Sequence, residues 1–255
     1  MHPLIRHQKI LALLEGHRVV PVGRLARAVR VSEMTVRRDL SLLRDRGLVR
    51  KVHGGAVLEV RKAEEFHFSA TRQERVAEKQ AIAKEAATLV SPGSVVALGA
   101  GTTTWHVART LADRTDLTFI TNSTNIALEL DRGHSNIILI GGHFRTPGDA
   151  LVGPPALWTL ERLQIDLLFL GANGIDLKAG YTTPVLAEVE VNLAMIRKAS
   201  RVVLVADHSK FGRVTLASFG PMEAAHVLIT DPATPRSILA AIRRRGVQVV
   251  VAAKN

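Results

Sequence analysis

The stretch Ser32-Glu33-Met34-Thr35-Val36-Arg37-Arg38-Asp39-Leu40 decides how the N-terminal part of the chain folds. Serine is a favoured N-cap, and a carboxylate at the next position suits the positive end of a helix dipole. Val36, Leu40 and Leu43 recur at i, i+4 and i+7, so they share one apolar face. The spacing therefore predicts a helix after Ser32 whose exposed side carries Thr35, Arg37, Arg38 and Ser41.

Two shorter helices precede this one. Ile10 and Leu14 repeat at helical spacing in a first segment, and Pro21 opens a second segment in which Leu25 and Val29 share a face. A tight turn then leads to the third helix. A short helix that supports a longer one, with hydroxyl and guanidinium groups near the start of the longer helix, is what reading the DNA major groove requires.

A basic wing follows the third helix. Residues 48–57 predict two short strands around the His53-Gly54-Gly55 turn, which would lie beside a duplex. The alternative, a three-helix bundle used only for dimerisation, would not need exposed arginines next to a basic wing. The residues expected to contact DNA are Arg24, Ser32, Thr35, Arg37, Arg38, Ser41, Arg50, Lys51, His53 and Gly54.

The charge is concentrated in the same part of the chain. Residues 1–62 carry 14 Lys or Arg against 5 Asp or Glu, whereas residues 63–255 carry 20 against 18. Such a segment attracts a phosphate polymer through counterion release. Charge alone also allows a solvated basic face, or an RNA-binding or chromatin-like protein. The ordered helix spacing and the lack of interleaved aromatic residues argue against RNA.

Apolar runs alternate with amphipathic stretches through the rest of the chain. This alternation predicts an α/β domain with a largely parallel sheet, covered on both faces. The expected strands are Val95–Gly99, Leu117–Thr121, Ile137–Ile140, Leu167–Leu170, Val202–Ala206, Val227–Thr230 and Val247–Val251, with helices around 103–112, 124–131, 184–199 and 235–245. We predict a DNA-binding domain over 1–58, a linker over 59–77 whose Phe66 and Phe68 pack on one of the domains, and an α/β domain over 78–255.

Ligands of such sheets bind where the strands end. The Gly-rich turn Gly99–Thr104 lies between a strand and a helix, and it could cradle a phosphate with backbone amides and hydroxyls. Ser123 is expected chiefly to cap the next helix. Arg145 could bind an anion or form a surface salt bridge, and Lys210 could meet an anionic ligand or be solvated.

Several classes of protein fit the sequence poorly. Thr104 replaces the third glycine of a dinucleotide fingerprint, and no Walker-type phosphate loop is present. The contiguous Asp207-His208-Ser209 cannot orient as a catalytic triad, and the ten histidines lack ligand spacing, so we expect no metal and no cofactor. The absence of cysteine, of a signal peptide and of a long apolar stretch favours a cytoplasmic protein without a membrane span.

The stretch from Ser32 to Leu40, closed by Leu48-Val49-Arg50 and His53-Gly54-Gly55-Ala56, resembles the helix-turn-helix signature of the DeoR family. The α/β half is similar to the DeoR sensor domain, whose fold is like that of ribose-5-phosphate isomerase. The pieces that match are Gly101-Thr102-Thr103, Thr121-Asn122-Ser123, Gly141-Gly142, Gly174-Ile175-Asp176, Glu188 with Glu190, and Asp207 to Phe211. Asn192 stands where a basic residue is expected, and Gly99 where an aspartate is frequent.

The resemblance implies a transcription regulator, expected to be a repressor of a carbohydrate operon that a phosphorylated sugar or related metabolite releases from DNA. The implied effector contacts are Gly101, Thr102, Thr103, Thr104, Asn122, Ser123, Arg145, Gly174, Asp176, Thr182, Glu188, Asp207 and Lys210. A homo-oligomer, a dimer or a tetramer, would place two winged helices on repeated or palindromic half-sites of double-stranded DNA. An isomerase-like enzyme is the alternative, because Asp176, Glu188 and Lys210 could nominally serve proton transfer, but the attached DNA-reading module argues against it.

Overall fold

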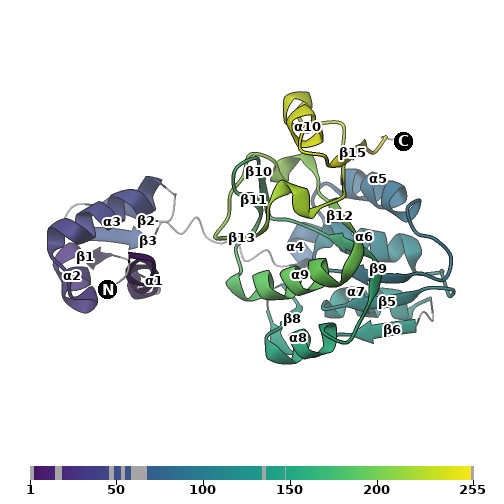
Figure 1. The fold of residues 1–255 in the computed structure, drawn as a ribbon, viewed down its shortest axis with the longest axis horizontal. Helices are drawn as coiled ribbons and strands as arrows, with labels where there is room; N and C mark the ends of the chain where they lie inside the picture. The colour runs from purple at the N-terminus through teal and green to yellow at the C-terminus, as the bar shows by residue number, and fades with distance from the viewer. Residues whose placement is uncertain are drawn as a thin grey trace. The chain divides into compact units, whose positions relative to one another are not determined.

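The computed structural model describes residues 3–14, 19–45, 49–52, 55–58, 68–133, 136–146 and 148–253. The chain forms two units, residues 1–64 and 65–255, which are described separately (Figure 1). Most of the predicted linker, residues 59–67 with Phe66, lies outside the described residues. Residues 68–77 belong to the second unit.

The first unit packs three helices against a small antiparallel sheet of strand order β1-β3-β2. Leu25, Val36 and Leu40 are buried in its core, as the helical spacing predicted. The three predicted helices and the two wing strands are confirmed, whereas the two-residue β1 was not predicted. The elements are α1 (Pro3–Leu14), β1 (Val20–Pro21), α2 (Val22–Val29), α3 (Glu33–Asp45), β2 (Val49–Val52) and β3 (Gly55–Leu58).

A tight turn sets α2 against α3. Arg30 adopts the left-handed conformation (φ 54°), and its N–H donates to the carbonyl of Arg27. Ser32 then caps α3, because its hydroxyl accepts a hydrogen bond of 3.2 Å from the N–H of Thr35. The predicted N-cap is confirmed.

The second unit is built on a seven-stranded sheet with the order β15-β14-β12-β9-β4-β5-β6, in which every pair is parallel. All seven predicted strands are confirmed to within three residues at each end. From the central β4 the chain runs outward one way to β6, then returns to β9 and runs the other way to β15. The strands are β4 (Val95–Leu98), β5 (Thr118–Thr121), β6 (Asn136–Leu139), β9 (Ile165–Leu170), β12 (Ala199–Val205), β14 (Val227–Thr230) and β15 (Gln248–Val251).

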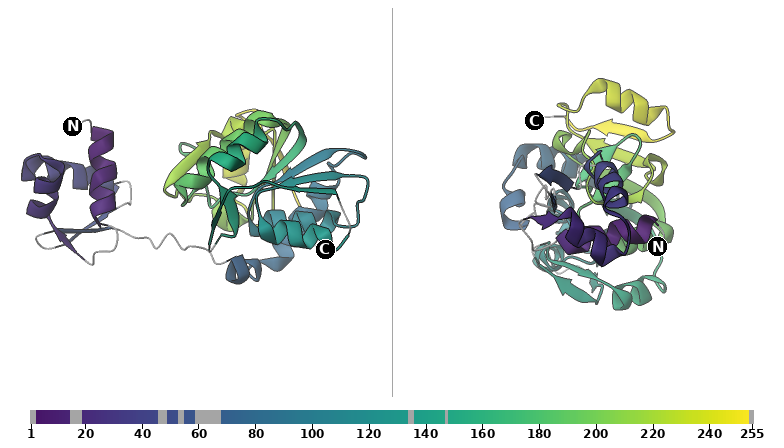
Figure 2. Two further views of the ribbon diagram at one scale, coloured as in Figure 1. Left: turned by 90° about the horizontal axis from the view of Figure 1, so that it is seen from below. Right: turned by 90° about the vertical axis from the view of Figure 1, so that its left-hand side faces the viewer.

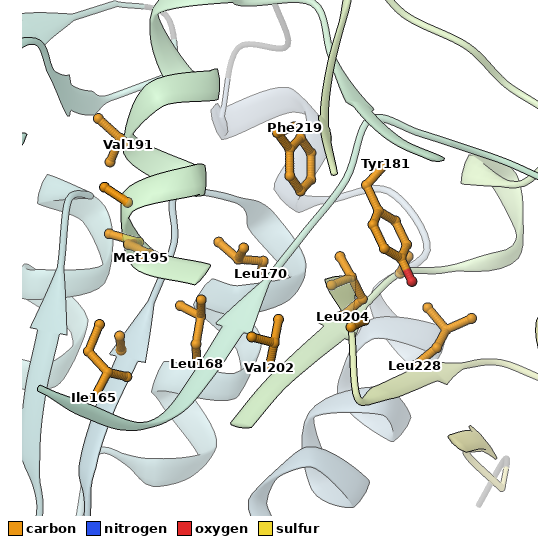
Figure 3. Close-up of a cluster of buried hydrophobic side chains, with 14 of the residues drawn as sticks. Ile165, Leu168, Leu170, Tyr181, Val191, Met195, Val202, Leu204, Phe219 and Leu228 are labelled. Carbon is orange, nitrogen blue, oxygen red and sulfur yellow. The ribbon is translucent and has the colours of Figure 1, made fainter. Parts of the chain in front are cut away.

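Alternate side chains of the sheet enter two separate apolar clusters. Leu168 and Leu204 point to one cluster, shown in Figure 3, while Phe169 and Val203 point to the other. Helices α8 and α9 cover the first face, and α5, α6 and α7 cover the second (Figures 1 and 2). The helices of this unit are α4 (Phe68–Arg72), α5 (Val76–Ala87), α6 (Thr102–Leu111), α7 (Thr124–Asp131), α8 (Pro154–Leu160), α9 (Leu186–Lys198) and α10 (Arg236–Arg243).

Short elements that the sequence did not predict complete the first face. A three-stranded sheet of order β10-β11-β13 covers the cluster with Tyr181 and Phe219, whose rings stack with centroids 6.1 Å apart. A hairpin, β7-β8, precedes α8. These elements are β7 (His143–Arg145), β8 (Ala150–Val152), β10 (Gly174–Asp176), β11 (Gly180–Thr183), β13 (Ala217–Gly220) and the 3-10 helices η1 (His208–Lys210) and η2 (Met222–Ala224).

Candidate functional site

Helix α3 presents a basic face in the first unit. Arg37 and Arg38 are exposed, as is Arg24 on α2, and Thr35 is half-buried. Arg37 lies 3.6 Å from the carboxylate of Glu33 one turn earlier, a surface pair that leaves the guanidinium accessible. Of the other predicted DNA contacts, Ser32 is exposed and Ser41 is half-buried, Arg50 and Lys51 lie in β2, and His53 and Gly54 lie outside the described residues.

Asp39 has a structural role that the sequence analysis did not foresee. It is only 3 % exposed, and it accepts hydrogen bonds from Arg6 Nε (2.6 Å) and Arg6 Nη2 (2.9 Å), with His7 Nε2 at 2.9 Å. Burial raises the pKa of this carboxyl, but the bonds from Arg6 and His7 outweigh it and leave the pKa lowered. Asp39 therefore joins α3 to α1.

A pocket opens in the second unit at the carboxyl ends of β4, β9 and β12. It lies where the winding of the sheet reverses, between β4 and β9, which is where open α/β sheets bind ligands. Residues following each of the three strands contribute to it, and side chains of β7 and α9 face them. The lining comprises Phe68, Thr71, Ala100, Gly101, Thr102, Thr103, Arg145, Gly148, Gly171, Ala172, Asn173, Thr183, Pro184, Val185, Glu188, Asn192, Val205, Ala206, Lys210 and Phe219.

The loop after β4 lines this pocket, and hydrogen bonds fix its conformation. The N–H of Ala100 donates to Asn122 Oδ1 (3.0 Å), and the hydroxyl of Thr104 donates to the carbonyl of Gly99 (2.7 Å). Helix α6 begins at Thr102, and the first N–H groups of a helix have no acceptor within it. Backbone donors and the positive end of the helix dipole therefore face the pocket, an arrangement that suits an anion.

The opposite wall carries an ion pair. Arg145 Nη1 lies 4.0 Å from Glu188 Oε1, and the hydroxyl of Thr183 donates to Glu188 Oε2 (2.9 Å). Burial raises the pKa of Glu188, with Thr183 and Arg145 opposing the shift. Asn192, one of the two departures from the DeoR pattern, lines the same wall. This wall can donate and accept hydrogen bonds, as recognition of hydroxyl groups requires.

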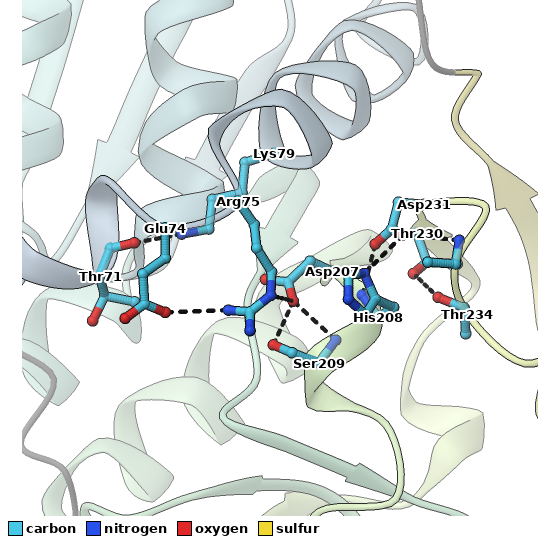
Figure 4. A network of polar contacts seen from close by, with 11 residues as sticks. Thr71, Glu74, Arg75, Lys79, Asp207, His208, Ser209, Thr230, Asp231 and Thr234 are labelled. Atoms are coloured by element: carbon cyan, nitrogen blue, oxygen red, sulfur yellow. Dashed lines mark hydrogen bonds and ion pairs between the residues drawn. The ribbon is translucent and has the colours of Figure 1, made fainter.

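A cluster of charged residues, Glu74, Arg75, Lys79 and Asp207, is shown in Figure 4. Asp207 is 1 % exposed; its Oδ1 accepts from the N–H and hydroxyl of Ser209 and lies 3.8 Å from Arg75 Nε. Burial lowers the pKa of Lys210, and the charge of Asp207 opposes the shift. Burial likewise lowers the pKa of Lys79 to about 8, and its ammonium donates to the carbonyl of Thr71 (2.6 Å).

Seven residues expected to contact the effector do not line the pocket, and several of them use their polar side chains to bind the protein itself. Ser123 caps α7 by accepting from the N–H of Ile126, Asp176 accepts two N–H groups of its own turn, and Thr182 donates to the carbonyl of Gly174. The seven are Thr104, Asn122, Ser123, Gly174, Asp176, Thr182 and Asp207. Gly101, Thr102, Thr103, Arg145, Glu188 and Lys210 do line it, whereas Phe68, Thr71 and Thr183 were not predicted.

Helix α6 buries a histidine and a tryptophan. His106 is 4 % exposed and its Nε2 has no partner among the described residues; burial lowers its pKa to about 4. Trp105 is buried as well, whereas Trp158 is 62 % exposed on α8. Within the described ranges, no three His, Asp or Glu side chains gather as a metal site would need. None of the described helices is long and apolar enough to cross a membrane.

Comparison with known proteins covers both units. A model of the DeoR-like helix-turn-helix domain matches residues 6–62, and one of the DeoR C-terminal sensor domain matches residues 74–232. The HTH-type transcriptional regulator GlpR of Haloferax volcanii is 38% identical over 98% of each chain. The transcriptional repressor AccR of Agrobacterium fabrum is 39% identical over 93% of this chain and 92% of its own.

Among solved structures, the ribose 5-phosphate isomerase A of Methanocaldococcus jannaschii is similar over 52% of this chain and 53% of its own, with 20% identity and a TM-score of 0.40. The relatives of high identity are named as regulators and repressors. Both the helix-turn-helix half and the sensor half match one family, in the order and at the places where the two units lie. The chain therefore belongs to the DeoR family of transcriptional regulators.

Proposed function

We propose that this protein is a sequence-specific DNA-binding repressor of carbohydrate metabolism whose hold on its operator is released by a phosphorylated sugar or a related metabolite. The observation that carries the effector class is the chemistry of the pocket: the Gly101–Thr103 amides and Lys210 suit a phosphate, while Arg145 and Glu188 suit hydroxyl groups. The effector binds more tightly to one arrangement of the protein than to the other, and this difference in affinity limits how much the effector can change the affinity for DNA.

The basic face of α3 supports the DNA half of the proposal. Arg37 and Arg38 are exposed on a helix whose other side is buried, so they can reach phosphates or guanine edges. We further propose a cytoplasmic homo-oligomer, a dimer or a tetramer, because two copies match the repeated half-sites that such helices read. Sedimentation velocity of the full chain, alone and with operator, tests the oligomer.

A screen for thermal stabilisation tests the effector class. The panel contains glycerol 3-phosphate, fructose 1-phosphate, fructose 6-phosphate, ribose 5-phosphate, inorganic phosphate and the unphosphorylated counterparts. A ligand of the native state raises the apparent melting temperature by mass action. We expect stabilisation by phosphorylated members only, and release by the same compound of a DNA duplex selected from a random pool.

Two lysine variants make the screen specific to the pocket. Lys210→Met should lose the stabilisation and the release while it still binds the duplex, because the pocket loses the cation that we assign to the phosphate. Lys178→Met changes an exposed lysine outside the pocket lining and should behave as the wild type. Stabilisation by an unphosphorylated sugar or an acid, with no response to any phosphate, would contradict the phosphate assignment.

A further inference from the structure

Helix α4 is the first helix of the second unit and follows the DNA-binding unit along the chain. Nine residues, 59–67, connect the last strand of the first unit to Phe68, the first residue of α4. Phe68 and Thr71 both line the pocket, together with residues that follow β4 and β12. The first helix after the DNA-binding unit is therefore also part of the pocket wall.

Three contacts hold α4 on the second unit. The ring of Phe68 meets Trp105 edge-on, with centroids 6.3 Å apart at 79°. The guanidinium of Arg72 lies 4.8 Å from the centre of the same indole. The buried ammonium of Lys79 donates to the carbonyl of Thr71 at 2.6 Å, across the turn that joins α4 to α5 (Figure 4). The partners in these contacts lie on α5 and α6, and Phe68 and Thr71, the residues of α4 that line the pocket, take part in two of the contacts themselves.

The surroundings of α4 carry an excess of positive charge. The charged groups that act on Lys79 are the cations Arg75 and Lys210 and the carboxylates Glu74 and Asp207, so three cations, Lys79 included, face two carboxylates when both lysines are protonated. The third carboxylate of Figure 4, Asp231, is paired with His208 at 3.0 Å. Oδ2 of Asp207 is buried without a hydrogen-bond partner among the described residues. An anion in the pocket would compensate the excess charge on the side of Lys210 and strengthen the attachment of this region to the ligand.

From this arrangement we infer that Thr71 and Phe68 contact the bound effector, and that α4 is thereby the element through which the effector acts on the DNA-binding unit. Thr71 supplies a hydroxyl to the polar part of the ligand, and Phe68 covers its carbon skeleton. Because the ligand contacts α4 directly, it binds more tightly when α4 is docked on Trp105 than when it is not. That differential affinity is what a ligand needs to shift a conformational equilibrium. The inference rests on the proposed function, since it takes the pocket to be the effector site.

Variants of Thr71 test the contact. Thr71→Val keeps the shape and removes the hydroxyl, whereas Thr71→Ser keeps the hydroxyl; Thr159→Val, on α8 outside the pocket, is the matched control. In titrations with the phosphorylated compounds of the panel, we expect Thr71→Val to bind roughly 2- to 12-fold more weakly, the loss of one hydrogen bond. Thr71→Ser and Thr159→Val should stay close to the wild type, and all three should bind the DNA duplex without ligand as the wild type does.

Trp105 reports the docking of α4 directly. The chain has two tryptophans, so Trp158→Phe leaves Trp105 as the only one. In that background, the same compounds should protect Trp105 from acrylamide quenching, and Phe68→Leu should weaken both the protection and the release of DNA. This inference alone would be overturned if the wild type responded to a phosphorylated compound, Thr71→Val bound that compound with the same affinity, and the compound did not protect Trp105 from acrylamide. A wild type that responds to none of the phosphates would overturn the proposed effector class and this inference together.

Discussion

Replacing Lys79 by methionine should change how the stability of the second unit depends on pH. Lys79 is 1 % exposed, and burial lowers the pKa of its ammonium to about 8. The ordinary value in an unfolded chain is about 10.4. Between these two values the unfolded chain binds more protons than the folded one, so the free energy of unfolding rises with pH. Methionine has nearly the same length and no proton to lose.

The magnitude follows from the two pKa values. Weighting the protonated and neutral forms of Lys79 at each pH, the wild type gains about 2 kcal/mol of stability between about pH 7 and about pH 9.5, and the Lys79→Met variant gains none of it. The gain is fully present only above the unfolded value and is lost as the pH falls through about 8. At neutral pH the variant no longer buries a charge, which stabilises it, but it also loses the hydrogen bond to the carbonyl of Thr71, which destabilises it. The two effects oppose each other, so the pH dependence of the stability is a clearer test than its value at one pH.

Urea unfolding followed by tryptophan fluorescence measures this slope. Both tryptophans, Trp105 and Trp158, lie in the second unit, so the signal reports that unit alone. Lys84→Met is the control, because Lys84 is exposed on the same helix α5. We expect the control to keep the pH dependence of the wild type, with the same denaturant slope in all three proteins. Parallel stability curves for the wild type and Lys79→Met from about pH 7 to about pH 9.5 would refute the reasoning.

Three other predictions use the same preparations. Arg37→Ala and Arg38→Ala should each weaken binding to the selected duplex and reduce the slope of log K against log salt by about 0.9 for each DNA phosphate that the variant no longer neutralises; unchanged slopes in both would remove the basic face of α3 from the interface. Gly180→Ala should destabilise the second unit by more than about 2 kcal/mol, because φ is +75° and the new carbon would overlap the carbonyl of a β13 glycine, whereas Gly246→Ala, at φ +83° with open space around it, should cost about 1 kcal/mol in urea unfolding. Burial raises the pKa of Tyr181, the only tyrosine, so tyrosinate absorbance should appear on raising the pH only as the protein unfolds; a normal alkaline titration of the folded protein would contradict its burial.

The large sheet could be predicted because its strands lie between two layers of helices. A strand such as β9 is then apolar on both sides, and its continuous run is visible in the sequence. The small sheet could not be predicted, since β11 consists of Gly180-Tyr181-Thr182-Thr183, a pattern that a loop would also show. The strands of this small sheet are stabilised by packing on the apolar cluster, and the strand preferences of their own residues do not predict them.

The pocket was predictable only in its loops. Gly101–Thr103 and Lys210 follow buried strands, so the topology of a parallel sheet brings them to one edge. Phe68 and Thr71 line the same pocket from an earlier helix, and no periodic pattern in the sequence indicates that they lie there. The role of Asp39 could not be predicted for a similar reason, because its partner Arg6 lies 33 residues away.

The strand order has a consequence for the synthesis of the protein on the ribosome. The DNA-binding unit ends at residue 64 and its contacts lie within these residues, so it can fold as soon as it has emerged from the ribosome. The centre of the large sheet, by contrast, joins β4 to β9 and β9 to β12, and it cannot close before residue 205 has been made. At typical rates of translation, roughly 7 to 28 s separate the two events. A nascent chain can therefore hold a folded DNA-binding unit for many seconds before the large sheet, and with it the pocket, has formed.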